Sequence, residues 1–248
     1  MPKLDPHRFR LERAKELDLL AEILIRNGVC SDPSPLYKAS SACRARTDDR
    51  WGYSVERLLF RIPEQDLKHR IPDKVYDVNL AFSTSITGHC NEGGEIRDPL
   101  HTLEFNIVIN GKHNYGGKTN TVMCSWHLDR DVRPGAGTHT FIHPCYHFQH
   151  GGRHTWNSRL NFGASLILES PRYAHPPMDE ILGIDFVLTN YIKSSNLSFR
   201  DRRDYKKLLK NAQERMWRPY IQALVFAWGA IPNDSEWRFT LPWPQLVG

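Results

Sequence analysis

The segment Leu103-Glu-Phe-Asn-Ile-Val-Ile-Asn-Gly111 alternates apolar and polar residues and ends in an Asn-Gly pair. Alternation with a period of two places one set of side chains on each face of a β-strand, and Asn-Gly is typical of tight hairpin turns. Similar runs extend from Val78 to Phe82 and from Val122 to Leu128. Together they predict an antiparallel meander with one buried face and one solvated face.

Helical periodicity dominates on both sides of this region. Asp5-Pro6 has the residues of a helix N-cap followed by proline at the first helical position, and apolar residues then recur at helical spacing as far as Gly28. Downstream, Pro176-Pro177 introduces a strongly apolar segment, which predicts a buried helix, and a second helix is expected from Asp201 to about Trp228. Pro219 is expected to kink the second helix.

These patterns predict an α+β fold with an N-terminal helix, a four-stranded antiparallel meander, and two long C-terminal helices packed on one face of the sheet. The fourth strand is expected at Thr138 to His143. Residues 1–75 are expected to form a helical lead-in, with short helices at Pro35 to Arg44 and Tyr53 to Phe60. Residues 76–248 hold the core domain and an extended C-terminal tail, and the two parts are expected to form one compact unit.

Composition excludes several classes of protein. Hydrophobic residues make up 40% of the 248 residues, which is ordinary for a globular domain. The five cysteines form no CxxC pair, which argues against a disulfide framework or a zinc ribbon and favours a reducing cytoplasm. No signal peptide and no apolar window of membrane-spanning length is recognisable, so a cytoplasmic protein with no membrane partner is expected.

Histidines gather in the segment from Thr138 to Gly152, and they are the first candidate metal ligands. Pro144 and Gly151-Gly152 exclude a regular helix there, so strand parity decides which side chains share a face. Parity pairs His143 with His147 and leaves His150 on the other face. Two residues of the preceding strand share one parity and complete the candidate set for zinc or manganese: His127, Asp129, His143, His147 and His150. The alternative is a group of hydrogen-bonded histidines that hold no metal.

Cys145 is the candidate nucleophile, because the flanking His143 and His147 would lower the pKa of its thiol. The alternative is an inert, buried cysteine. No phosphate-binding glycine loop, GxSxG or HExxH motif is present, so no organic cofactor site is expected and whether the chain is an enzyme stays open.

A basic segment near the C-terminus is the candidate nucleic-acid surface. The formal charge of +5 and the isoelectric point near 9.0 agree with such a role. The alternative is an ordinary solvated helix face. The candidate residues are Arg200, Arg202, Arg203, Lys206, Lys207 and Lys210.

The order of elements and one short motif resemble the ubiquitin-conjugating (E2) fold. The matching segments are Phe141-Ile-His143-Pro144-Cys145-Tyr146, Gly163-Ala-Ser-Leu166-Ile-Leu and His175-Pro176-Pro177-Met-Asp-Glu-Ile181-Leu-Gly-Ile. The resemblance covers residues 76–228. Cys145 stands where the family has asparagine, and Ser165 stands nearest the position of the family's cysteine, so no thioester cysteine carries over. The resemblance therefore implies a divergent, non-catalytic bacterial relative that binds a protein partner.

Three functions follow from these observations. The first is an E2-like interaction module within a bacterial multi-protein complex of a conjugation or defence system. The second is a metal-dependent hydrolase or nuclease that uses the His/Asp set. The third is a basic accessory protein that binds nucleic acid.

Overall fold

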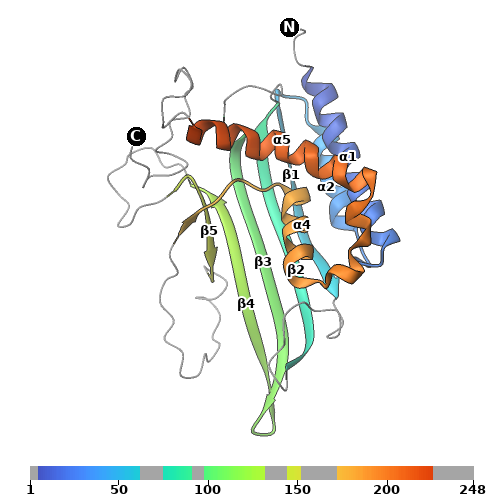
Figure 1. The fold of residues 1–248 in the computed structure, drawn as a ribbon, viewed down its shortest axis with the longest axis vertical. Helices are drawn as coiled ribbons and strands as arrows, with labels where there is room; N and C mark the ends of the chain where they lie inside the picture. Colours follow the sequence, from blue (N-terminus) through green and yellow to red (C-terminus); the bar gives the residue numbers. More distant parts are fainter. Residues whose placement is uncertain (1–4, 62–74, 91–97, 132–143, 152–171, 226–248) are drawn as a thin grey trace.

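The computed structural model describes residues 5–61, 75–90, 98–131, 144–151 and 172–225, and over these ranges the protein has an α+β fold (Figure 1). Its sheet is antiparallel, and the strands follow one another across it in chain order. The six strands are β1 (Arg50–Arg61), β2 (Val75–His89), β3 (Leu100–Tyr115), β4 (Lys118–Arg130), β5 (Tyr146–His150) and β6 (Tyr173–Ala174).

Two helices precede the sheet, α1 (Pro6–Arg26) and α2 (Ser34–Ala45). The carboxylate of Asp5 accepts a hydrogen bond from the backbone N–H of His7 at 3.0 Å, which caps the exposed amides at the start of α1. The expected N-terminal helix and the expected helix from Pro35 to Arg44 are therefore both confirmed.

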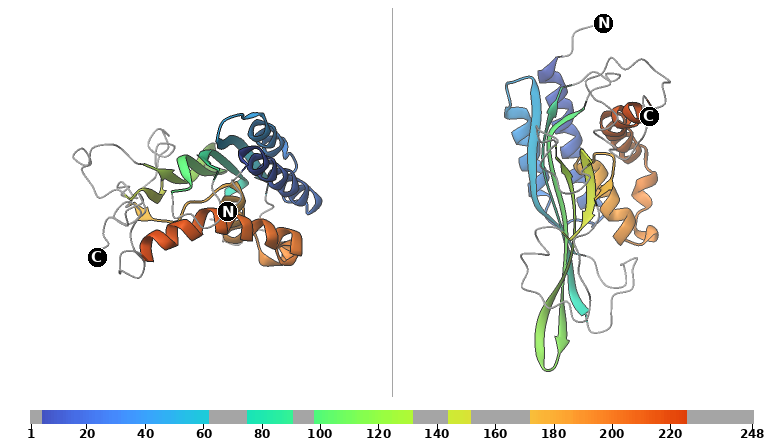
Figure 2. Two further views of the ribbon diagram at one scale, coloured as in Figure 1. Left: turned by 90° about the horizontal axis from the view of Figure 1, so that it is seen from above. Right: turned by 90° about the vertical axis from the view of Figure 1, so that its left-hand side faces the viewer.

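Two long helices follow the sheet, α4 (Glu180–Tyr191) and α5 (Arg203–Val225), and they lie on one face of it (Figures 1 and 2). We call this the helix face. Gly183 of α4 sits against the rings of Phe82 and Phe105 on β2 and β3, so the missing side chain lets the helix approach the sheet closely. Both expected C-terminal helices are confirmed, although α4 begins at Glu180 after its cap Asp179.

Helix α2 lies beside the edge strand β1, and α1 packs against α2 (Figure 2). Buried residues of α1, the sheet, α4 and α5 belong to a single apolar core. The described residues before position 62 therefore share this core with the residues that follow. The expected number of four strands is wrong, since the described residues form six.

The segment from Tyr53 to Phe60 is a strand, which corrects the expectation of a helix. Val55 pairs with Thr84 and Leu58 with Phe82, so β1 has two residues where β2 has one. Such a β-bulge turns two residues spaced by three toward the same side. Both Val55 and Leu58 are buried, and their spacing imitates one face of a helix.

Several predictions fall outside the described residues. These are the strand from Thr138 to His143, the segment from Gly163 to Leu168 that belongs to the E2 resemblance, and the tail beyond residue 225. The first strand of the predicted meander corresponds to β2, and the next two to β3 and β4.

Candidate metal centre

The face of the sheet opposite α4 and α5 carries a row of polar side chains, and we call it the polar face. The row contains one residue from each of five neighbouring strands, and each residue pairs directly with the next. In order across the sheet they are Ser54, Ser85, Glu104, Asp129 and His147. Residues that are paired across an antiparallel sheet point to the same side. The row therefore runs from β1 to β5 without interruption.

A neighbouring row adds His127, which pairs with Asn106 on one side and with Gln149 on the other. His127 and Asp129 are two residues apart on β4, so both point to the polar face. The three side chains His127, Asp129 and His147 come together here, and their ligand atoms all lie within 4.8 Å of one another.

The geometry of this cluster suits a metal ion. The Nε2 atom of His127 lies 3.6 Å from Oδ2 of Asp129, and the rings of His127 and His147 are 5.8 Å apart at an interplanar angle of 88°. An ion held at about 2.0–2.2 Å in a tetrahedral site places its ligands roughly 3.4 Å apart. The 3.6 Å between His127 and Asp129 is close to that spacing.

The cluster is buried on the side of β5 and open to solvent on the side of β3. His147 is buried, whereas the side chain of Asp129 is 34% exposed and Glu104 beside it is exposed. A ligand in this centre is therefore reached from the β3 side of the row. Partial burial also strengthens the attraction between a carboxylate and a cation, since fewer water molecules screen them.

His150 does not belong to this centre, which corrects its place in the predicted ligand set. It pairs with Trp126, and its ring packs edge-on against that indole at 4.8 Å, on the helix face. Its Nε2 atom lies 3.5 Å from Sγ of Cys124. Strand parity separates it from His147, and His143 lies outside the described residues.

Cys145 is buried with 2% of its surface exposed. Burial raises the pKa of its thiol well above the ordinary value, with a smaller contribution from Asp98, while Arg130 acts in the opposite direction. A thiol whose pKa is raised is a poor nucleophile, because the thiolate is the reactive form. These surroundings favour the inert interpretation of Cys145.

Comparison with protein-family models, curated proteins and solved structures finds no match. The resemblance to the E2 fold therefore stays a prediction. No helix within the described residues is both long and apolar enough to cross a membrane.

A second group of polar residues is buried between α1, β1, α4 and α5. Arg13 donates hydrogen bonds to the Tyr53 hydroxyl at 2.7 Å and to Glu180 at 3.0 Å. Arg215 donates to Asp179 at 2.7 Å, and Tyr53 donates a further hydrogen bond to Glu180. The network thus connects four elements that are distant in sequence.

This network contains one more carboxylate than guanidinium, since Glu16 also pairs with Arg13 and Arg215. Burial and the charge of Asp179 together raise the pKa of Glu180 to about 7, against the opposing effect of Arg13. The two guanidiniums lower the pKa of Asp179, despite its burial. A proton on Glu180 would balance the buried charges near neutral pH.

Asp179 is the N-cap of α4, because its Oδ1 accepts the backbone N–H of Leu182 at 3.1 Å. Its burial together with Arg13 could not be predicted from the sequence. No local pattern in the sequence pairs residues that are 166 positions apart.

The basic residues of the C-terminal region divide into two groups. Arg200 pairs with Asp185, Arg202 with Asp204, and Lys206 with Asp201. The remaining three, for which no ion pair is found among the described residues, are exposed on α5: Arg203, Lys207 and Lys210. Acidic neighbours thus offset half of the predicted nucleic-acid surface.

Proposed function

We propose that the protein is a metal-dependent hydrolase whose ion is held by His127, Asp129 and His147. The observation that carries this proposal is the convergence of two imidazoles and one carboxylate within 4.8 Å on the polar face. Catalytic zinc sites commonly use three protein ligands of this kind and leave a fourth position for water. The exposed side of Asp129 leaves room for that water and for a substrate.

The chemistry follows from the charge of the ion. A divalent ion held by His127, Asp129 and His147 would lower the pKa of a coordinated water to about 7 and so supply hydroxide at neutral pH. In ester hydrolysis the hydroxide oxygen would bond to the electrophilic centre while the ester bond breaks, and the leaving oxygen would take up a proton. Zinc is the first choice for two imidazoles and a carboxylate, and manganese the second.

The test is hydrolysis of bis(p-nitrophenyl) phosphate, a small activated diester. Purified protein should release p-nitrophenolate, lose the activity after dialysis against a chelator, and regain it with zinc or manganese. Asp129→Asn should lower kcat at least 100-fold while retaining the wild-type unfolding midpoint. Activity that survives chelation, or that requires iron and oxygen, would contradict a hydrolytic metal centre.

A further inference from the structure

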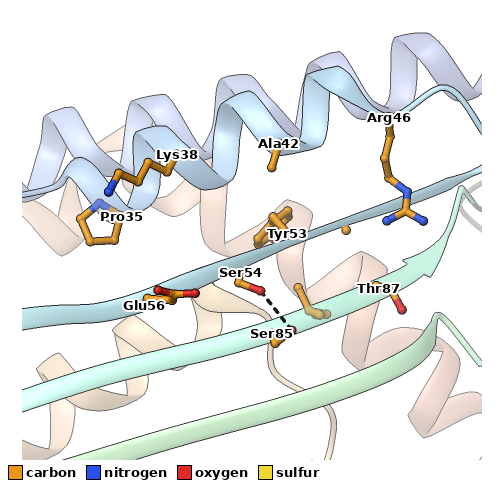
Figure 3. A pocket seen from close by; sticks show the side chains of 11 residues that line it. Pro35, Lys38, Ala42, Arg46, Tyr53, Ser54, Glu56, Ser85 and Thr87 are labelled. Carbon is orange, nitrogen blue, oxygen red and sulfur yellow. Dashed lines mark hydrogen bonds between the residues drawn. The ribbon is translucent and has the colours of Figure 1, made fainter.

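The polar face also contains a groove, bounded by α2 on one side and by β1 and β2 below (Figure 3). Its volume is about 540 Å³, within the usual range for sites that bind small molecules. The wall consists of Pro35, Lys38, Ala42 and Arg46 of the α2 segment, and the polar floor includes Ser54, Ser85 and Thr87.

The floor of the groove and the metal centre belong to the same row. Ser54 and Ser85 stand in register with Asp129 and His147, with Glu104 between them. Neighbouring strands are about 4.8 Å apart, so Ser85 lies two strands, or roughly 10 Å, from Asp129. A ligand that extends along the row from the groove can therefore reach the metal centre.

Exposure along the row agrees with this direction of approach. Ser54, Ser85 and Glu104 are exposed, and the side-chain exposure falls to 34% at Asp129 before His147 is buried. The exposed part of the polar face thus leads from the groove to the open side of the metal centre.

Arg46 supplies a positioned anion-binding group at one end of the groove. Asp48 accepts hydrogen bonds from its Nε and Nη2 atoms at 2.9 and 3.0 Å, which fixes the plane of the guanidinium. Its Nη1 atom lies at the floor, because a Cβ atom on Gly52 would be 3.2 Å from it and 2.8 Å from Thr87 Cγ2. Figure 3 shows the guanidinium directed from the end of α2 toward the strands.

Hydroxyl groups lie on the floor beside that position, although Thr87 turns its methyl carbon Cγ2 toward Gly52. Thr87 and Thr102 are hydrogen-bonded through their hydroxyls at 2.7 Å, and Ser54 donates to Ser85 at 3.1 Å. A guanidinium edge together with hydroxyl donors is the usual protein environment of a phosphate group. Glycine at position 52 keeps this space open, since a larger residue would fill it.

Lys38 and Glu56 carry opposite charges and both line the groove. Figure 3 places them together at the end away from Arg46. Their charges offset one another, and Asp48 offsets the charge of Arg46, so the guanidinium edge at Nη1 is the donor that the groove offers to an anion. A chain with a phosphate at the Arg46 end would pass over the hydroxyl floor toward Asp129.

We propose that the groove binds one phosphate of a single-stranded nucleic acid and thereby places a phosphodiester further along the same strand at the metal centre. This inference rests on the proposed hydrolase, and it makes the substrate a phosphodiester chain. Water supplies the oxygen of the new P–O bond, the ester P–O bond breaks, and the departing sugar oxygen takes up the remaining proton.

Binding is tested first, without metal, by fluorescence anisotropy of a labelled single-stranded octanucleotide in the presence of a chelator. Arg46→Gln should weaken binding about tenfold, the effect of one lost charge-assisted hydrogen bond. The matched control is Arg44→Gln, two positions earlier on α2, because Arg44 pairs with Asp18 and does not line the groove. It should bind as the wild type does.

Hydrolysis is tested second, and it separates the two proposals. Arg46→Gln should raise KM for the octanucleotide about tenfold and leave kcat/KM for bis(p-nitrophenyl) phosphate unchanged, since the small diester does not span the groove. Equal binding by the wild type and Arg46→Gln would overturn the groove proposal, even if the small diester is hydrolysed. So would a loss of binding confined to Lys207→Ala and Lys210→Ala, which would locate the nucleic acid on α5. If the protein binds the octanucleotide through Arg46 but shows no metal-dependent hydrolysis, the hydrolase proposal is rejected and the groove proposal stands.

Discussion

Asp129 on β4 lies directly opposite His147 on β5, and this pairing joins a predicted ligand from each of two strands into one centre. Neither residue is unusual by itself. The cluster depends on the register between β4 and β5, because a shift of β5 by one residue would turn the side chain of His147 to the helix face. The short strand β5 is therefore as important to the proposed site as the ligands themselves.

Gly183→Ala tests how closely α4 approaches the sheet. Helix propensity alone predicts that alanine stabilises this position by about 1 kcal/mol. A Cβ atom here would meet Phe105 and lie 2.9 Å from Phe82 Cε2, so we expect a net loss of about 1–3 kcal/mol in the free energy of unfolding. Urea denaturation measures it. Phe105→Leu in the same chain should recover part of the loss, and a stabilised single variant would show that α4 packs elsewhere.

Glu180 should make stability depend on pH. Its pKa in the folded protein, about 7, exceeds its ordinary value of 4.5, so the folded state retains a proton that the unfolded state has released. Glu180 should therefore make stability fall as pH rises from about 5 to 7 and then level off, by a total on the order of 3 kcal/mol. The lowered pKa of His175 acts in the opposite direction below about pH 6.5. The lowered pKa of Asp179 acts only below pH 4, outside this window.

The measurement for Glu180 is urea unfolding at pH 5, 6, 7 and 8. Glu180→Gln should remove most of the slope, because glutamine cannot release the proton. The exposed Glu214 pairs with Arg218 on the surface of α5, and Glu214→Gln should keep the wild-type slope. An unchanged slope in Glu180→Gln would place the titration on another group of the network, with Arg13, Tyr53, Glu16, Asp179 and Arg215 as the neighbours.

Cys145 should behave as a buried structural residue. Iodoacetamide at pH 8 should label Cys145 in the native protein at least 100-fold more slowly than in urea, since burial removes access and raises the pKa of the thiol. Peptide mass mapping gives the rate for each cysteine. Cys145→Ala should retain the hydrolysis of bis(p-nitrophenyl) phosphate; abolished hydrolysis in a folded variant would restore the thiol as a catalyst.

The sequence predicts the centre of the fold well, because strong periodicity determines β2, β3 and β4, a standard N-cap determines α1, and an apolar run determines α4. It fails at β1, where the bulge after Val55 replaces a period of two with a spacing of three. Arg57 in that bulge has a φ of 48°, and nothing about an arginine residue predicts a positive φ.

The same contrast holds for the candidate site. Parity along one strand predicts that His127 and Asp129 share a face and that His147 and His150 do not, and the structure agrees on both. The pairing of neighbouring strands depends on the whole sheet. The sequence therefore could not predict that Glu104 and Ser85 lie in the same row as Asp129 and His147. The buried pairing of Arg13 with Glu180 depends in the same way on tertiary packing.

The most direct test of the metal centre is the metal content of protein purified without added metal and then dialysed with equimolar zinc. Elemental analysis of the wild type should give about one ion per chain. His147→Ala should reduce this at least tenfold, whereas His150→Ala should retain it, because His150 lies on the helix face beside Trp126. Equal metal content in the wild type and His147→Ala, or loss of metal with His150→Ala alone, would contradict a centre formed by His127, Asp129 and His147.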